Sequence, residues 1–392
     1  MNEIQVILEA FASVKSDSGR AALASIVKVT GSAYRRPGAR MLIMPDGRTV
    51  GSISAGCLDR DVCERARTVT ASGVPAVATY DTTAAGDDVW GLGLGCAGLV
   101  EVLIEPLGHN APANRVLDFL GERVSRRDVG VLVTVFHSLG AAAAAVGSHL
   151  MLTEGDPGFC NIDDPQLAKA VLEDAHRALR AARSLVKEYS LPGGTAEALI
   201  EVVSPPAPLL IFGAGDDAVP LARLAKEVGW HVTVVDSRPG LATTERFPWA
   251  DAVMVVRPEN AAQYLSVDGR TAAVIMTHNY THDLELLKML LASPMRYLGI
   301  LGARARTLAM LRALRETGVP VREQDLAKVY SPVGTDIGAE TPEEIALAIL
   351  AEIKAVCMGR SAGFLKDRKG PIHDREDTGN LSVGPAAPAQ SG

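Results

Sequence analysis

The sequence predicts an α/β protein in two parts: an N-terminal mixed α/β domain with antiparallel strands, and a C-terminal Rossmann-like domain with a doubly wound parallel sheet. A chain of 392 residues is too long for one average domain. Hydrophobic residues make up 47% of the chain but aromatic residues only 4%, so the core is aliphatic, as in α/β proteins. A proline-rich linker at residues 204–208 separates a part with hairpin signals from one in which strands, glycine turns and helices alternate.

Charge and cysteine content narrow the classes of function. There are 39 Lys and Arg residues against 46 Asp and Glu residues, a formal net charge of −7. We expect no nucleic-acid partner, because a dedicated binder needs a basic face. Five cysteines without a C-x-x-C pair indicate neither a disulfide framework nor a closed zinc site. We therefore expect a cytoplasmic protein with reduced thiols and, from its acidic, amphipathic start, no secretory signal.

One uncharged segment, residues 129–152, is long enough to cross a bilayer. It is interrupted by His137, Gly140, Gly147 and His149, and much of its apolar content is alanine. We predict two strands joined by a small-residue loop, and no membrane span.

The N-terminal domain is assigned to residues 1–203. Its pattern predicts a first helix, a strand ending at Gly31, a hairpin around the Pro-Asp-Gly turn at 45–47, and a helix beginning near Cys57. Around residues 131–156, VLVTVFHS and GSHLMLTEGD repeat the pattern of the earlier SIVKVTGS and GARMLIMPDG. An internal duplication and a chance similarity both explain this. The second copy lacks the Arg-Arg-Pro and the cysteine, so in a duplication only the first copy has kept the chemistry.

The Rossmann-like domain is assigned to residues 209–358. Its last helix has a clear start, with Thr341 as N-cap, Pro342 in the first turn and Glu344 completing a capping box. Residues 359–392 have the composition of a disordered tail. The domain's strands are expected at residues 209–212, 231–236, 252–256, 273–277 and 297–301.

A dinucleotide-type glycine motif follows the first of these strands. Gly213, Gly215 and Ala218 give the form G-x-G-x-x-A between a strand and a helix, and Asp236 ends the next strand, where a ribose-binding acid belongs. The first glycine permits the tight turn, and the second lets backbone N–H groups approach a phosphate. This predicts a site for NAD(P) or another nucleotide.

Three residues of the same segment oppose pyrophosphate binding. Asp216 and Asp217 lie where the phosphate would sit, and Pro220 removes a donor from the first turns of the helix. A Rossmann-type fold that binds no dinucleotide is therefore the alternative interpretation of this segment.

Other polar residues follow the later strands, at the edge where open α/β sheets bind ligands. His278 ends one strand, with His282 four residues later, and Gly302 and Arg304 begin another strand-to-helix turn. Helix capping explains the histidines better than a metal site does, because no third ligand is visible. Arg304 beside Gly302 is a candidate anion cradle.

Two motifs of the N-terminal domain also carry possible chemistry. Arg35 and Arg36, with Arg40 beyond, concentrate positive charge on a Gly/Pro-constrained loop, which suits a phosphate or another oxyanion. A solvated loop explains them equally well. Cys57 follows Gly56 at the expected helix start, where the helix N-terminus favours a thiolate that could ligate a soft metal or hold a transferable sulfur.

The remaining cysteines differ in their surroundings. Cys96 lies among glycines, which makes it a second thiolate candidate, whereas Cys63 and Cys357 fit a core role on amphipathic helices. Cys160 is uninformative.

Eight motifs in order resemble the XdhC/CoxI family, the accessory proteins of xanthine dehydrogenase and of molybdenum-containing CO dehydrogenase. The similarity extends from about residue 21 to residue 356. The motifs are GSAYRRPGARM with PDGRTVGSISAGCLDRDV, GLGLGCAG, IFGAGDDA, VVDSRP, MTHNYTHD, GILGARAR and SPVGTDIGAETPEEIALAILAEI. The resemblance implies a cytoplasmic chaperone that binds molybdenum cofactor, protects it while its terminal sulfur is installed, and passes it to an apo-molybdenum hydroxylase.

The resemblance also implies a homodimer, a cysteine desulfurase as a further partner, and roles for individual residues. Cys57 would approach molybdenum or carry sulfur, while Arg35 and Arg36 would meet phosphate or oxo groups. Ala55 departs from the family, in which two glycines usually precede the cysteine. The candidate binding residues are Arg35, Arg36, Gly56, Cys57, Cys96, Gly213, Gly215, Asp236, His278, Gly302 and Arg304.

Two other classes of function stay open. An NAD(P)-dependent oxidoreductase would use the glycine motif and Asp236, although no Tyr-x-x-x-Lys proton relay is present, and Tyr280 and His278 are the nearby acid/base candidates. A scaffold would join a cysteine desulfurase to its target enzyme without binding pterin. We expect a non-catalytic maturation chaperone rather than an enzyme.

Overall fold

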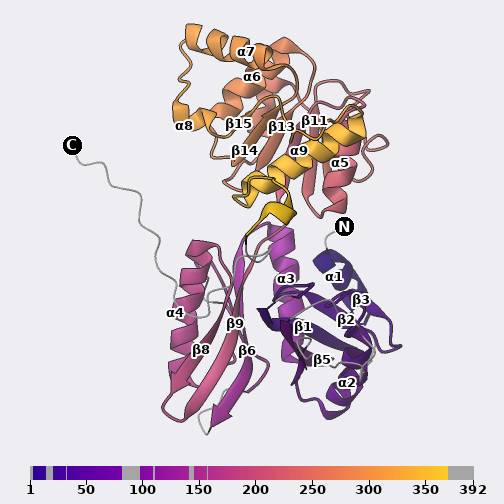
Figure 1. Cartoon of the computed structure of the whole chain (residues 1–392), viewed down its shortest axis with the longest axis vertical. Helices are drawn as coiled ribbons and strands as arrows, with labels where there is room; N and C mark the ends of the chain where they lie inside the picture. Colours follow the sequence, from indigo (N-terminus) through magenta and orange to yellow (C-terminus); the bar gives the residue numbers. More distant parts are fainter. Residues whose placement is uncertain are drawn as a thin grey trace, which may run out of the picture. The chain divides into compact units, whose positions relative to one another are not determined.

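The computed structural model of the chain (Figure 1) describes residues 3–14, 21–31, 33–81, 98–108, 111–140, 145–156 and 158–369. The chain divides into two compact units, one comprising Glu3–Pro205 and the other Pro206–Lys369. The first unit contains two antiparallel sheets and the second a parallel sheet. The predicted α/β fold class is therefore confirmed.

The first half of the N-terminal unit forms the antiparallel sheet β3-β2-β1-β5-β4. Backbone N–H of Met44 bonds the Arg48 carbonyl at 2.8 Å and closes the expected hairpin turn between β2 and β3. The elements are α1 (Glu3–Val14), β1 (Ala21–Gly31), β2 (Arg40–Ile43), β3 (Thr49–Gly51), α2 (Asp59–Ser72), β4 (Ala76–Asp81) and β5 (Gly98–Leu107).

The second half of this unit forms the antiparallel sheet β7-β6-β9-β8. The uncharged segment 129–152 contributes to β6 and β7, and in the described part of the chain no helix is long and apolar enough to cross a membrane. The elements are α3 (Pro112–Arg126), β6 (Gly130–Gly140), β7 (Ser148–Thr153), α4 (Pro165–Ala181), β8 (Leu185–Leu191) and β9 (Gly194–Val203).

The two halves repeat one topology. Apart from β3, each runs helix, strand, strand, helix, strand, strand, and the sheet order β2-β1-β5-β4 corresponds to β7-β6-β9-β8. The register shifts between Ile26 and Lys28 in the β1–β5 pair and between Val135 and His137 in the β6–β9 pair. The two halves therefore share their element order, their sheet order and the position of the bulge.

One helix packs on one face of each sheet, and α1 and α3 form a further cluster with residues of both sheets. Side chains of α2 pack on one face of the first sheet and those of α4 on one face of the second. The opposite faces of the two sheets meet in a cluster of Val27, Leu103, Phe136, Val186 and Leu199. The layers of this unit are therefore helix, sheet, sheet, helix (Figure 1).

Ionisable side chains also link the two sheets. In each pair, a basic residue of one half contacts a carboxylate of the other half. Lys28 of β1 bonds Glu197 of β9 at 2.7 Å, and His137 of β6 bonds Glu101 of β5. Lys28 and His137 follow the bulge in their respective strands. Each half of the repeat thus supplies a basic side chain to a carboxylate of the other half.

A second, more deeply buried set follows the same rule. Arg40 of β2 bonds Glu201 of β9 at 2.9 Å, and His149 of β7 bonds Glu105 of β5 at 2.8 Å. Arg40 is only 4% exposed, and His149 and Glu105 are buried. The same sequence distance separates Lys28 from His137 and Arg40 from His149, so the two sets occupy equivalent positions in the repeat.

The C-terminal unit is a parallel sheet with strand order β12-β11-β10-β13-β14-β15. Of these strands, β15 was not predicted, since it has only two residues. The elements are β10 (Pro208–Phe212), α5 (Ala218–Glu227), β11 (His231–Asp236), β12 (Ala252–Val255), a 3₁₀ turn (Pro258–Gln263), β13 (Ala272–Ile275), α6 (Tyr280–Leu291), β14 (Tyr297–Ile300), α7 (Arg304–Glu316), α8 (Glu323–Leu326), β15 (Val329–Tyr330), α9 (Pro342–Cys357) and a second 3₁₀ turn (Leu365–Asp367).

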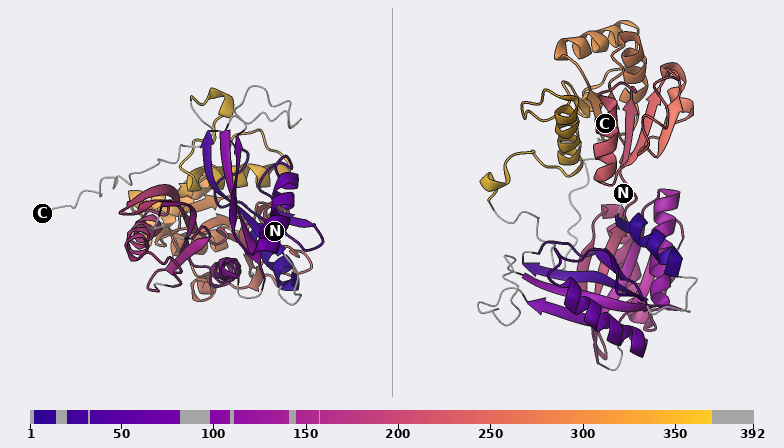
Figure 2. Two further views of the ribbon diagram at one scale, coloured as in Figure 1. Left: turned by 90° about the horizontal axis from the view of Figure 1, so that it is seen from below. Right: turned by 90° about the vertical axis from the view of Figure 1, so that its right-hand side faces the viewer.

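Helices cover both faces of this sheet, as the doubly wound pattern predicts (Figure 2). α5 and α9 share one hydrophobic cluster with the sheet, and α6 and α7 share the other. The predicted capping box is present: backbone N–H of Glu344 bonds Thr341 Oγ1 at 3.3 Å, and backbone N–H of Thr341 bonds Glu344 Oε2 at 3.0 Å. Residues 370–392 of the expected tail lie outside the described residues.

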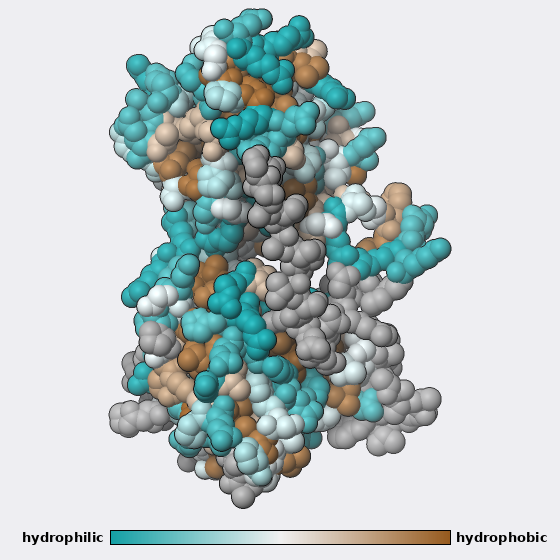
Figure 3. Space-filling model, turned by 90° about the vertical axis from the view of Figure 1, so that its left-hand side faces the viewer, coloured by the Kyte–Doolittle hydropathy of each residue, from teal (hydrophilic) through white to brown (hydrophobic). Residues whose placement is uncertain are grey.

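Apolar residues on the face drawn in Figure 3 form small patches among hydrophilic ones. Scattered apolar groups of this kind are ordinary on a folded protein and indicate no particular partner.

Candidate functional site

The loop between β1 and β2 carries Arg35 and Arg36. At its base, backbone N–H of Gly38 bonds the Ile26 carbonyl at 2.9 Å, and Arg40 Nη1 bonds the Gly38 carbonyl at 2.8 Å. We expected Arg40 to add surface charge to this loop. Instead it is buried and paired with Glu201, so it supports the loop from beneath.

Glu3, at the start of α1, connects this loop to the segment that leads to Cys57. Its carboxylate pairs with the Arg35 guanidinium through Oε2 and accepts the backbone N–H of Ser52 at 3.0 Å through Oε1. The two motifs that the sequence singled out separately therefore meet at one carboxylate. Sequence reasoning did not assign Glu3, because no spacing links residue 3 to residues 35 and 52.

The Cys57 turn is organised by Ser54. Ser54 Oγ accepts the backbone N–H groups of Gly56 at 3.0 Å and Leu58 at 3.1 Å, and donates to Asp59 Oδ1 at 2.6 Å. Helix α2 begins at Asp59, so the helix predicted near Cys57 starts two residues later. Gly56 has φ +100°, which favours glycine. Cys57 is half-buried beside the core under α2.

The other thiols are placed differently. Cys96 lies outside the described residues. Cys63 and Cys357 are partly buried against hydrophobic clusters, as their core interpretation requires. Burial raises the pKa of both thiols, and a neighbouring Asp59 adds to the effect on Cys63, so both favour the neutral form.

In the C-terminal unit, the glycine motif forms the turn from β10 to α5. Gly213 has φ +122°, and a Cβ there would lie 2.4 Å from the Met276 carbonyl oxygen. A Cβ on Gly215 would lie 2.7 Å from Asp217 Oδ1. Gly213 needs glycine for its conformation and for its close approach to the segment after β13, whereas a Cβ at Gly215 would require the Asp217 carboxylate to shift.

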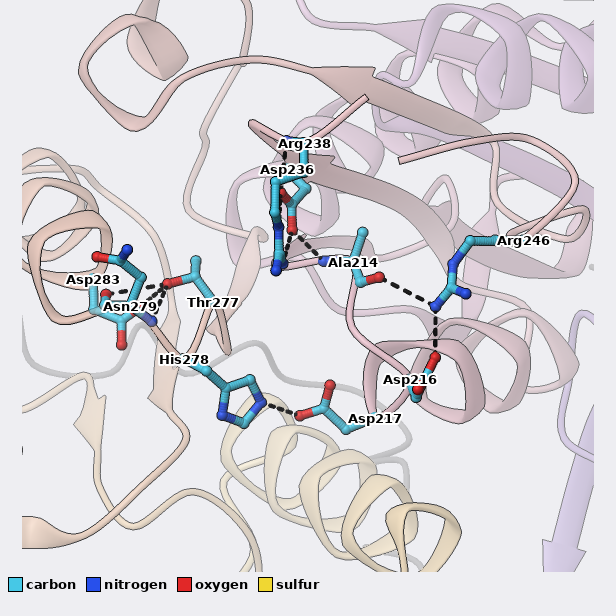
Figure 4. Close-up of polar contacts among 10 residues, drawn as sticks. All are labelled: Ala214, Asp216, Asp217, Asp236, Arg238, Arg246, Thr277, His278, Asn279 and Asp283. Atoms are coloured by element: carbon cyan, nitrogen blue, oxygen red, sulfur yellow. Dashed lines mark hydrogen bonds and ion pairs between the residues drawn. The ribbon is translucent and has the colours of Figure 1, made fainter. Parts of the chain in front are cut away.

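Asp236 is fully engaged within the protein (Figure 4). Its carboxylate accepts the backbone N–H groups of Ala214 at 2.7 Å and Arg238 at 2.9 Å, and the Arg238 guanidinium at 2.9 and 2.6 Å. Burial alone would raise the pKa of Asp236, but the hydrogen bonds from Arg238 and Ala214 outweigh it and lower the pKa. The expected ribose acid therefore fixes the glycine turn to the end of β11.

Replacing Asp236 with asparagine is expected to destabilise the C-terminal unit by about 2 kcal/mol at neutral pH, because charge-assisted hydrogen bonds are lost. Since the folded pKa lies below the unfolded value of about 3.9, this contribution is present above that value and is lost as pH falls through the folded pKa. Urea unfolding at several pH values measures the difference. Asp216→Asn, at a side chain that is 95% exposed, is the control. A pH-independent difference would contradict the assignment.

His278 closes the opposite side of the same crevice. Its backbone has φ +58°, which is uncommon outside glycine, and its Nε2 lies 2.7 Å from Asp217 Oδ2 (Figure 4). The sheet order reverses between β10 and β13, so this pair spans the switch point at which open α/β sheets bind ligands.

His282 belongs to the start of α6 rather than to a metal site. Its backbone N–H bonds the side chain of Asn279, the N-cap, at 3.1 Å. In the described ranges, no group of three or more His, Cys, Asp or Glu residues could hold a metal ion.

Gly302 and Arg304 form the turn between β14 and α7. Gly302 has φ +121°, and Arg304 is exposed at the first position of α7. The nearby Arg306 pairs with the buried Asp283 at 2.7 Å. Arg304, unlike Arg306, is therefore placed to meet a ligand at this edge of the sheet.

Comparison with known proteins covers both units. The family model described as the XdhC and CoxI family matches residues 15–81, and the one described as the XdhC Rossmann domain matches residues 209–353. A protein of Bacillus subtilis named as a probable subunit of xanthine dehydrogenase is 33% identical over 342 residues, which are 86% of this chain and 93% of that protein. The chain belongs to the XdhC and CoxI family.

Two further XdhC-like relatives agree with this. The molybdenum cofactor insertion chaperone PaoD of Escherichia coli is 23% identical over 86% of this chain and 84% of its own length. A crystal structure described as a xanthine dehydrogenase from Bacillus halodurans superposes with a TM-score of 0.72 at 29% identity, covering 92% of this chain and 97% of that one. The predicted family is thus confirmed, and with it the Rossmann assignment.

The family models match parts of the chain that contain most of the candidate residues, but Glu3 and Cys96 lie outside both matched ranges. The first includes the Arg35 loop and the Cys57 turn, and the second includes the glycine turn, His278 and Arg304. The second copy of the repeat, with α3 to β9, lies between the two matched regions.

Proposed function

We propose that this XdhC-family protein binds molybdenum cofactor, protects it during sulfuration, and delivers it to an apo-molybdenum hydroxylase of the xanthine dehydrogenase or CO dehydrogenase type. The observation that carries the proposal is similarity along both units to one relative named for xanthine dehydrogenase and to another named a molybdenum cofactor insertion chaperone. On this proposal the protein is an accessory chaperone in the cytoplasm rather than an enzyme.

The residues around Glu3 fit such a cargo. Molybdenum cofactor combines a pterin phosphate with a metal held by sulfur. The half-buried Cys57 offers a soft thiolate donor, and Arg35 and Arg36 offer charge for phosphate or oxo groups. Glu3 joins the Arg35 loop to the Cys57 turn, so one cargo molecule can meet both. Cys57 either contacts molybdenum or carries the sulfur, and Cys96 is a second thiolate candidate.

A carrier of this kind needs partners. We propose an apo-molybdenum hydroxylase as the acceptor, a cysteine desulfurase as the sulfur donor, and a homodimer as the working form. The alternative of a scaffold makes a different prediction, since a scaffold would bind desulfurase and hydroxylase but no pterin.

The decisive experiment measures molybdenum and pterin in the protein purified anaerobically from a host that makes the cofactor. We expect near-equal amounts of both, and a loss of about tenfold or more in Cys57→Ser, because a serine hydroxyl is a poor ligand for a soft metal. Cys63→Ser is the matched control, since its thiol lies on α2 near the same core. Arg35→Ala should weaken retention, whereas Arg48→Ala, at an exposed guanidinium, should not.

Two outcomes would contradict the proposal. Equal cofactor content in Cys57→Ser and the parent would remove the thiolate from the site. Stable binding of desulfurase and hydroxylase by protein that contains neither pterin nor molybdenum would favour the scaffold. Delivery is tested separately, by the activity that an apo-hydroxylase gains from the loaded protein with and without desulfurase.

A further inference from the structure

The crevice of the Rossmann unit contains a carboxylate of the protein itself. Asp217 Oδ1 lies 2.7 Å from the position that a Cβ on Gly215 would take. In a dinucleotide-binding turn the second glycine is required because the pyrophosphate lies against the backbone at that point. The Asp217 carboxylate therefore fills space that a pyrophosphate oxygen occupies in such domains.

Contacts across the crevice hold this carboxylate in place. His278 Nε2 lies 2.7 Å from Asp217 Oδ2. The backbone of His278 itself has φ +58°. Asp217 is only 18% exposed, while the adjacent Asp216 is 95% exposed and pairs with Arg246 at 2.7 Å. The two neighbouring acids thus differ: one is fixed over the glycine turn, and the other projects into solvent (Figure 4).

The rest of the crevice is also unsuited to a dinucleotide. Asp236, the expected ribose acid, already accepts two backbone N–H groups and a guanidinium. Pro220, in the first turn of α5, has no N–H to donate.

We propose that Asp217 is a built-in occupant of the phosphate position and that it makes this Rossmann domain reject ligands that contain a pyrophosphate. Two negative groups cannot share one desolvated position, so such a ligand would have to displace a carboxylate that His278 holds. This inference is independent of molybdenum cofactor and of the N-terminal unit.

The test uses the full chain and inorganic pyrophosphate in isothermal titration calorimetry. We expect no saturable binding by the parent at concentrations up to about 1 mM, which corresponds to negligible affinity. Asp217→Asn and Asp217→Ser should bind at least about tenfold more tightly, because the like charge is removed while the glycine turn and His278 stay. Asp216→Asn loses the same charge one residue away and should match the parent.

A further variant separates occupancy by the carboxylate from simple closure of the crevice. His278→Gly suits the positive φ and removes the contact to Asp217 but keeps the negative charge, so it should gain less pyrophosphate binding than the Asp217 variants do. Micromolar binding of pyrophosphate or NADH by the parent would overturn the proposal. So would folded Asp217 variants, verified by circular dichroism, that bind pyrophosphate no better than Asp216→Asn.

Discussion

Replacing Gly213 with alanine is expected to destabilise the C-terminal unit by about 3–5 kcal/mol. Two costs combine: an L-residue is strained at φ +122°, and its Cβ would lie 2.4 Å from the Met276 carbonyl oxygen. The clash involves backbone, so the glycine turn or the segment after β13 has to move. Urea unfolding followed by the fluorescence of Trp230 and Trp249, both in this unit, measures the change.

Gly240→Ala is the matched control for this substitution. Gly240 lies in the same unit, and nothing is within 4 Å of the position its Cβ would take. Its replacement should change stability by no more than about 0.5 kcal/mol, or slightly increase it. Equal effects of the two substitutions would show that the turn does not pack against the segment after β13.

Replacing Arg40 with methionine is expected to destabilise the N-terminal unit by a similar amount, about 3–5 kcal/mol. The substitution leaves the Glu201 carboxylate without its guanidinium and the Gly38 carbonyl without its donor. Removing one partner of a buried ion pair costs far more than the pair itself contributes, because the remaining charge is uncompensated. Thermal and chemical unfolding of the single variant measure this cost.

A double variant distinguishes that mechanism from a simple packing defect. Arg40→Met combined with Glu201→Leu should recover much of the lost stability, since an apolar pair can replace a buried ion pair. The exposed Arg48, whose guanidinium pairs with Asp46, should tolerate alanine with a change below about 1 kcal/mol. If the double variant were less stable than Arg40→Met, the unpaired charge could not be the cause.

Local signals predicted much of the fold. The glycine turn between β10 and α5 and the capping box of α9 depend on neighbouring residues, so spacing alone located them. The shared strand order and bulge position of the two halves could not be predicted from the sequence, because they arise only when distant strands pair.

The candidate site was predicted less completely, for the same reason. The sequence located Arg35 and Cys57 but not Glu3, which connects their segments, nor Ser54, which orders the Cys57 turn. Arg40 was expected to add surface charge because its partner Glu201 lies far along the chain. Buried pairing between distant residues leaves no local pattern.

The ion pair between Glu3 and Arg35 has a consequence for how an anion bound to Arg35 would be released. When a tightly bound anion leaves a protein, the cation that held it loses its partner. An unpaired guanidinium would therefore oppose release of the anion. Glu3 can take the place of the leaving anion on Arg35, so binding and release each exchange one anionic partner of the guanidinium for another. On the proposed function, such an exchange would lower the affinity of the loaded state and the barrier to unloading together.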